Sequence, residues 1–267
     1  MKKQKALVVD FDGTIASGKE GEVTLAIEDA IKTIIKKGYI FSIVTGRQYF
    51  GKIRETCKKL NLEYPQIVCG GAEIRNPKND EIFWAKYLQD VEAKSIIDYL
   101  LNKNIYFAVE KEQYIYTPDG KNHFYPSSFT FSDVHYVEIT SIPKIVIQAN
   151  CNEFSLSGIQ QIIFDLQNQY KDINLVKGKV GDHFGLDITA RQANKHIALL
   201  RYMKMLNLQQ DEIVGVGDGY NDFPLLMACG IKIAMQNAPH ELKDIADLII
   251  PTQKENGLLK VIDNFFK

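Results

Sequence analysis

The sequence predicts an α/β protein in which a doubly wound parallel sheet is interrupted by an inserted α+β domain. Three observations support this class. Several short apolar runs stop abruptly at a polar residue or a glycine, and amphipathic helical patterns separate them. In the middle of the chain, by contrast, strand patterns follow one another without an intervening helix, which is typical of an antiparallel α+β unit.

The core strands are predicted from apolar runs of four to six residues. Ala6–Val9 stops at Asp10, and the runs 39–44, 66–69 and 213–216 stop in the same way at polar or glycine residues. Strands that are apolar on both faces are typical of parallel sheets covered by helices on each side. We therefore expect all four runs in one parallel sheet.

The helices that connect these strands are predicted from apolar residues at spacings of three and four. Residues 24–37 show this pattern and are followed by Gly38, a frequent helix terminator. Residues 50–60 and 193–206 show the same periodicity. Short joins between strand, helix and strand predict right-handed parallel crossovers, and ligands of such sheets bind beyond the carboxyl ends of the strands.

The inserted domain is predicted over residues 84–188, so that residues 1–83 and 189–267 form the core. Its expected helices cover residues 88–103 and 156–170, and its expected strands cover 105–110, 114–117, 144–149, 173–178 and 184–189. The segment 117–141 has the least regular pattern, because prolines and a glycine interrupt it.

Composition excludes some classes of function. The 267 residues carry a formal net charge of −1, so no global attraction to nucleic acid or to an anionic membrane is expected. No apolar stretch approaches the roughly 20 residues that a membrane-spanning helix needs. The four cysteines form no CxxC pair, which favours free thiols in a reducing compartment. We therefore expect a cytoplasmic protein, and a monomer by default.

Polar side chains follow three of the predicted core strands. Asp10 and Asp12 come after the first, Thr45 after the second and Asp218 after the fourth. If these strands are parallel neighbours, their polar side chains meet at one edge of the sheet. Three carboxylates at such an edge offer the hard oxygen ligands that suit Mg²⁺, and the cation would relieve their mutual repulsion.

A simpler interpretation is that Asp10 and Asp12 only cap a turn before the first helix. The wider pattern argues against it, because Thr45, Lys195 and the polar cluster at 217–222 accompany them.

With these residues together, the chain resembles a haloacid dehalogenase (HAD) superfamily phosphatase of the Cof-type branch, with a type IIB cap. Four motifs carry the resemblance, which spans essentially the whole chain: Asp10-Phe11-Asp12-Gly13-Thr14, Thr45 followed by Gly46-Arg47, Lys195, and Gly217-Asp218 with Asn221-Asp222. The resemblance implies a HAD-like Rossmannoid core, with the insert acting as the cap that selects the substrate.

The resemblance also implies roles for the motif residues. Asp10 would attack phosphorus and form an aspartyl-phosphate, and Asp12 would act as general acid and then as general base. Thr45 and Lys195 would bind phosphoryl oxygens, together with Asn221 and the backbone N–H groups of Phe11, Asp12 and Gly46.

The metal site follows from the same resemblance. Mg²⁺ would be held by the Asp10 carboxylate, the Asp12 backbone carbonyl and Asp218. Asp222 would orient metal-bound water or Lys195 from nearby.

The leading hypothesis is a magnesium-dependent phosphatase acting on a small phosphorylated metabolite such as a sugar phosphate. Arg47 and His183 are candidate substrate contacts. Two alternatives stay open, a phosphomutase resembling phosphomannomutases and a phosphate-binding regulatory module without catalysis. Asp12 argues against the module, because a protein that only binds phosphate has no need of a general acid.

Overall fold

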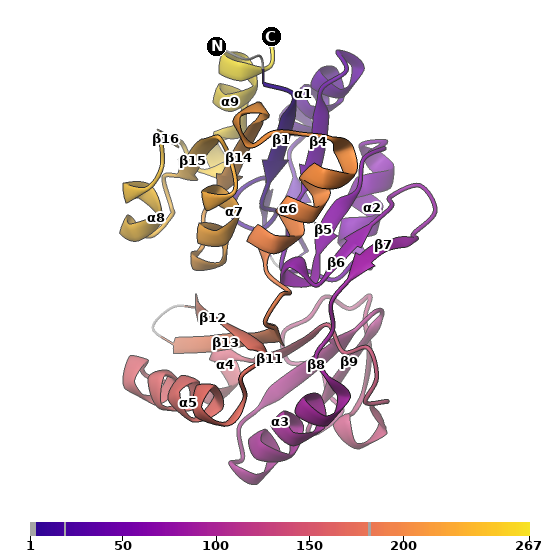
Figure 1. Ribbon diagram of the computed structural model, residues 1–267, viewed down its shortest axis with the longest axis vertical. Helices are drawn as coiled ribbons and strands as arrows, with labels where there is room; N and C mark the ends of the chain where they lie inside the picture. Colours follow the sequence, from indigo (N-terminus) through magenta and orange to yellow (C-terminus); the bar gives the residue numbers. More distant parts are fainter. Residues whose placement is uncertain (1–3, 19, 181–182) are drawn as a thin grey trace. The chain divides into compact units, whose positions relative to one another are not determined.

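The computed structural model of the protein describes residues 4–18, 20–180 and 183–267 (Figure 1). It divides into two compact units, one made of Met1–Trp84 and Lys195–Lys267 and the other of Ala85–Asn194. The sequence predicts the insert over residues 84–188, and the second unit runs from Ala85 to Asn194. It includes the whole of strand β13 (His183–Ala190), which pairs along its length with β12 (Ile173–Val180).

The first unit is built on a five-stranded sheet with the order β16-β15-β14-β1-β4, and every neighbouring pair in it is parallel. Its strands are β1 (Ala6–Val9), β4 (Ile40–Ile43), β14 (Ile213–Gly217), β15 (Ile231–Met235) and β16 (Leu248–Ile250). Strand β1 lies between β14 and β4 and is buried over its full length. The apolar runs at 6–9, 39–44 and 213–216 therefore form the expected parallel core.

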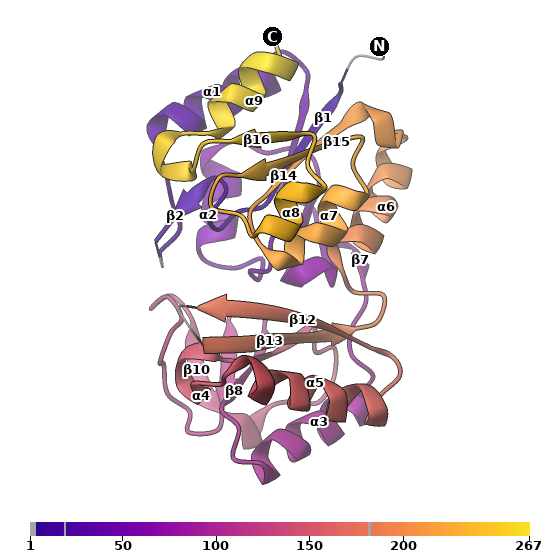
Figure 2. The ribbon, with the colours of Figure 1, turned by 90° about the vertical axis from the view of Figure 1, so that its left-hand side faces the viewer.

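Helices cover both faces of this sheet (Figure 2), which makes it doubly wound. Helices α1 and α9 pack together, and α6 and α7 pack together with the side chains of Ala6 and Val8 from β1. The α-helices of this unit are α1 (Leu25–Lys36), α2 (Lys52–Lys59), α6 (Lys195–Leu206), α7 (Phe223–Met227), α8 (His240–Asp244) and α9 (Leu258–Phe265). Short 3-10 turns cover Cys69–Gly71, Gln210–Glu212, Tyr220–Asp222 and Gln253–Glu255.

The run at 66–69 departs from the prediction. Only one parallel bridge, Val44 to Ile67, joins it to β4. Strand β5 (Gln66–Val68) pairs instead with β6 (Glu73–Arg75) in an antiparallel sheet whose third strand is β7 (Ile82–Ala85). The reason is a tight turn at Cys69–Gly71, where three consecutive residues have positive φ and reverse the chain.

The second unit is a six-stranded sheet with the order β10-β9-β8-β11-β13-β12. Besides β12 and β13 it contains β8 (Phe107–Lys111), β9 (Tyr114–Thr117), β10 (Thr130–Asp133) and β11 (Lys144–Ile147), and its helices are α3 (Asp90–Asn102), α4 (Ala149–Asn152) and α5 (Leu156–Gln169). A buried apolar cluster joins α3 and α5 to the sheet.

One strand of this unit was not predicted. Strand β10 lies in the irregular segment 117–141, is followed by a 3-10 turn at Val134–Tyr136, and pairs in parallel with β9, whereas the other paired strands of the sheet are antiparallel. Its residues Thr130-Phe131-Ser132-Asp133 contain a single large apolar side chain, which is too weak a pattern to predict a strand.

Two further expectations concern the whole chain. Cys57, Cys69, Cys151 and Cys229 are free thiols, as predicted. Within the described ranges, no helix combines the length and the apolar character needed to cross a membrane.

Candidate active site

The functional side chains meet because their strands are parallel neighbours in register. Val9 of β1 lies opposite Ile43 of β4 and Val216 of β14. One residue beyond, the Asp10 amide still donates to the Val216 carbonyl at 2.9 Å. The chains then leave the sheet, so that Asp10, Thr45 and Asp218 start their loops at the same edge, as the strand ends predict.

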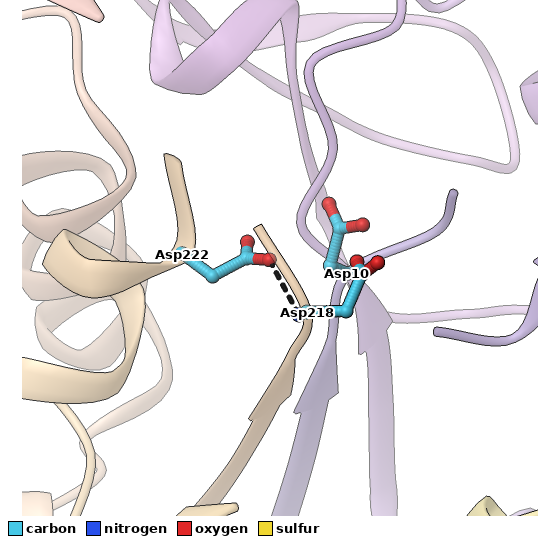
Figure 3. A group of neighbouring side chains, drawn as sticks. All are labelled: Asp10, Asp218 and Asp222. Atoms are coloured by element: carbon cyan, nitrogen blue, oxygen red, sulfur yellow. Dashed lines mark hydrogen bonds between the residues drawn. The ribbon is translucent and has the colours of Figure 1, made fainter. Parts of the chain in front are cut away.

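Three carboxylates gather at this edge (Figure 3). One oxygen from each of Asp10, Asp218 and Asp222 lies within 4.8 Å of the others. Burial, followed by the nearby charge of Asp222, raises the pKa of Asp10 well above its usual range. The same two causes raise the pKa of Asp218 to about 7. The protein therefore concentrates negative charge at a place where a free carboxylate is costly.

The Lys195 ammonium lies between two of these carboxylates. Its Nζ is 2.5 Å from Asp10 Oδ1 and 2.6 Å from Asp222 Oδ1, and all three side chains are buried. Burial by itself lowers the pKa of Lys195, but the two carboxylates outweigh it and the net pKa is raised. The lysine thus stays charged and fixed at the first turn of α6.

Asp222 accepts three hydrogen bonds from protein groups. Its Oδ1 bonds Lys195, while its Oδ2 accepts the backbone N–H groups of Asp218 at 2.8 Å and Gly219 at 2.9 Å, the first of which Figure 3 draws as a dashed line. A Cβ at position 217 would lie 2.4 Å from the Asp222 Cβ, so the strand must end in glycine there. Asp222 therefore braces the lysine and the loop that carries Asp218.

Asp218 is oriented by two side chains for which the sequence suggested no role. Thr14 Oγ1 donates to its Oδ1 at 3.2 Å, and Asn237 Nδ2 donates to its Oδ2 at 2.7 Å. Asn237 lies two residues beyond the end of β15, the strand next to β14. Asn237 meets the same criterion as Asp10, because it is a polar residue shortly after a core strand.

The residues present fit a divalent cation such as Mg²⁺. Carboxylate oxygens are the hard donors that this ion prefers, and the raised pKa values of Asp10 and Asp218 reflect burial first and then the crowding of negative charge, which a cation would relieve. Asp10 and Asp218 are the better ligands of the three, because Asp222 accepts three hydrogen bonds from protein groups, whereas Asp218 accepts two and Asp10 accepts one.

Asp12 does not direct its carboxylate into this cluster. Both of its oxygens are bound by Arg47, with Nε 2.8 Å from Oδ2 and Nη2 2.6 Å from Oδ1. The side chain of Asp12 is 48% exposed, and that of Arg47 is 22% exposed. A contribution of Asp12 to a metal site would thus come from its backbone carbonyl, which is the ligand that the family resemblance implies.

The predicted phosphate-binding residues lie on the loops around the carboxylates. Thr45 is fully buried, and its Oγ1 accepts the backbone N–H of Arg47 at 3.1 Å. A Cβ at Gly46 would lie 3.9 Å from Asn221 Nδ2, so the amide of Asn221 faces the loop after β4. Phe11, the residue that follows Asp10, is fully buried.

His183 belongs to the second unit. It begins β13, pairs with Val180 and is half-buried. Its role as a substrate contact stays a prediction.

Comparisons with known proteins identify relatives that match nearly the whole chain. Residues 7–262 match the family model described as haloacid dehalogenase-like hydrolase. The phosphatase YwtE of Bacillus subtilis, named as a 5-amino-6-(5-phospho-D-ribitylamino)uracil phosphatase, is 28% identical over 97% of this chain and 97% of its own. The phosphatase YwpJ of the same organism is 27% identical over 95% of this chain and 97% of its own.

Solved structures show the same fold. A haloacid dehalogenase-like hydrolase from B. subtilis superposes with a TM-score of 0.81 at 23% identity and covers 98% of this chain and 99% of its own. BT4131, described as a HAD subclass IIB sugar phosphatase, gives a TM-score of 0.80 at 19% identity. The match covers 98% of this chain and 99% of BT4131.

The fold, the motif residues and these matches define the class: the chain belongs to the haloacid dehalogenase-like hydrolases. Within that family it is a phosphatase of the Cof type.

Proposed function

We propose that this phosphatase requires Mg²⁺ and hydrolyses a small phosphorylated metabolite through a phosphorylated Asp10. The observation that carries the proposal is the environment of Asp10, a buried carboxylate at a parallel-strand end, 2.5 Å from a buried lysine and clustered with two further carboxylates. We further expect the enzyme to be cytoplasmic and monomeric.

The first chemical step would form the acyl phosphate. Lys195 holds Asp10 Oδ1, which leaves Oδ2 to attack phosphorus as the bond between phosphorus and the leaving oxygen breaks. Asp12 would give its proton to that leaving oxygen. The Lys195 ammonium, the Thr45 hydroxyl and the backbone N–H groups of the Asp10 loop would stabilise the phosphoryl oxygens. Bound Mg²⁺ would offset further negative charge on the phosphoryl group.

The second step would restore the enzyme. Asp12, now ionised, takes a proton from a water molecule whose oxygen attacks phosphorus. The bond between phosphorus and Asp10 Oδ2 breaks, inorganic phosphate leaves, and Lys195 again pairs with the free carboxylate. Asp12 gives one proton to the leaving oxygen in the first step and regains one from water in the second.

The substrate class that we propose is a phosphorylated sugar or sugar alcohol. The support comes from two similar proteins, since the name of YwtE specifies a phosphoribityl compound and BT4131 is described as a sugar phosphatase. Both descriptions place the phosphate on a polyhydroxylated carbon chain. The second unit, with His183, would select among such substrates.

A direct test measures phosphate release from 4-nitrophenyl phosphate and from a panel of sugar phosphates. Activity should require Mg²⁺, stop in a chelator and disappear in Asp10→Asn. Asp29→Asn is a matched control, because Asp29 is an exposed carboxylate on α1. A phosphomutase would isomerise sugar phosphates with little release of phosphate, and a binding module would bind phosphate and Mg²⁺ without turnover.

A further inference from the structure

Arg47 holds both oxygens of Asp12 by two parallel N–H bonds of 2.8 and 2.6 Å. Each bond uses one lone pair of one oxygen, and together the two bonds set the plane and the direction of the carboxylate. The remaining lone pairs can still meet a leaving group, in the orientation that Arg47 sets. The arginine therefore controls where the Asp12 carboxylate lies.

The guanidinium of Arg47 is itself held in place. Its Cζ lies 5.4 Å from the centroid of the Phe11 ring, a cation–π distance. Gly21, in the turn between β2 (Ala16–Ser17) and β3 (Glu22–Val23), has φ +72°, and a Cβ there would lie 3.3 Å from Arg47 Nη1 and 2.8 Å from the Phe11 ring. The short hairpin after the catalytic loop thus packs against the arginine.

A plain surface ion pair is the alternative interpretation, and exposed pairs contribute little to stability. Two features distinguish this pair. It is bidentate, which fixes the orientation of the carboxylate as well as its charge. It also joins two functional segments, the loop after β1 and the loop after β4, at the residue to which acid–base catalysis is assigned.

We propose that Arg47 is a positioning residue for Asp12. It orients the carboxylate in the resting enzyme and keeps that orientation while the carboxylate serves the leaving group. Arg47 thus acts through Asp12 and not as a direct contact of the phosphoryl group. This inference rests on the proposed function, in which Asp12 is the general acid.

The test compares two substrates of nearly equal shape and different leaving groups, phenyl phosphate and 4-nitrophenyl phosphate, at saturating Mg²⁺. The nitrophenolate leaves with little help from an acid, whereas phenolate needs a proton. In Arg47→Ala, kcat/KM should fall roughly 10- to 100-fold for phenyl phosphate and less than about threefold for 4-nitrophenyl phosphate. Arg47→Lys, which keeps one donor, should recover part of the loss.

A double-mutant cycle tests whether the effect passes through Asp12. In an Asp12→Asn background, Arg47→Ala should change kcat/KM for phenyl phosphate by less than about twofold, because the partner has already been altered. Arg54→Ala is the control, because Arg54 forms a partly exposed ion pair with Asp80 on the same unit. The Arg54 variant should keep the wild-type ratio of kcat/KM for phenyl phosphate to kcat/KM for 4-nitrophenyl phosphate.

An equal loss of kcat/KM on both substrates would overturn the proposal, because it would indicate that Arg47 contacts the phosphoryl group. No loss on either would make the pair merely structural and overturn it equally. If Arg47→Ala does not fold, Arg47→Gln gives the same comparison. A wild-type protein that hydrolyses neither substrate contradicts the proposed function itself, so the two failures are distinguishable.

Discussion

The Asp218 carboxylate should destabilise the metal-free protein at neutral pH, and replacing it should therefore stabilise that form. Burial and the charge of Asp222 raise the pKa of Asp218 from 3.8 to about 7. The folded state then binds more protons than the unfolded state between these values. Stability consequently falls as pH rises from about 4 to about 7.

The magnitude follows from that pKa difference. A rise from 3.8 to about 7 corresponds to at most about 4 kcal/mol at pH 8, since each pKa unit is worth about 1.4 kcal/mol. Asp218→Asn removes this cost, but the amide oxygen can replace only one of the two carboxylate oxygens that now accept from Asn237 Nδ2 at 2.7 Å and from Thr14 Oγ1 at 3.2 Å. Losing one of these bonds costs roughly 1–3 kcal/mol. We expect a net stabilisation of about 1–3 kcal/mol at pH 8 and less at pH 5.

Urea unfolding in a chelator, followed by circular dichroism at pH 5 and pH 8, measures this difference. In Mg²⁺ the wild type should be the more stable of the two proteins. An ion that binds only the folded wild type adds about 2.7 kcal/mol to its free energy of unfolding at a hundred times its Kd. The reasoning is refuted if the metal-free variant is less stable than wild type at pH 8. It is equally refuted if Mg²⁺ stabilises both proteins to the same extent.

Three further predictions follow from the same contacts. Lys195→Met should lower the free energy of unfolding by roughly 3–5 kcal/mol in denaturant titrations, because it leaves two buried carboxylates without their partner. Asn237→Ala should weaken Mg²⁺ binding measured by calorimetry about tenfold while the fold is retained, because Asp218 loses an orienting donor; unchanged affinity would count against that role. Gly13→Ala should abolish Mg²⁺ binding, since Gly13 has φ +76° and a Cβ there would lie 2.1 Å from Asp218 Oδ2; normal binding would show that the loop tolerates a side chain.

Much of the site could be predicted because buried parallel strands are recognisable in a sequence as short apolar runs. The apolar runs before Asp10, Thr45 and Asp218 fix where the chain leaves the sheet, and pairing in register brings those exits together. Lys195 needed the resemblance to a known family, since a lysine at the start of a helix carries no signal of its own. Its contact with Asp10 spans 185 residues of sequence separation.

The parts that were missed depend on tertiary contacts. The Asp12–Arg47 pair joins two loops, and nothing in either segment specifies that these side chains meet. The run at 66–69 has the composition of a parallel core strand, but the turn that follows it redirects its pairing. Strand β10 is held by its neighbour β9 and not by its own apolar pattern.

The nucleophile assignment is the central claim, and trapping the intermediate tests it most directly. Asp12→Asn should slow hydrolysis of the acyl phosphate more than its formation from 4-nitrophenyl phosphate, because only a good leaving group dispenses with the acid. Acid-quenched samples of that variant, digested and analysed by mass spectrometry, should carry one phosphoryl group on the peptide that contains Asp10. A phosphoryl group on any other peptide, or phosphate release that persists in Asp10→Asn, would contradict the account.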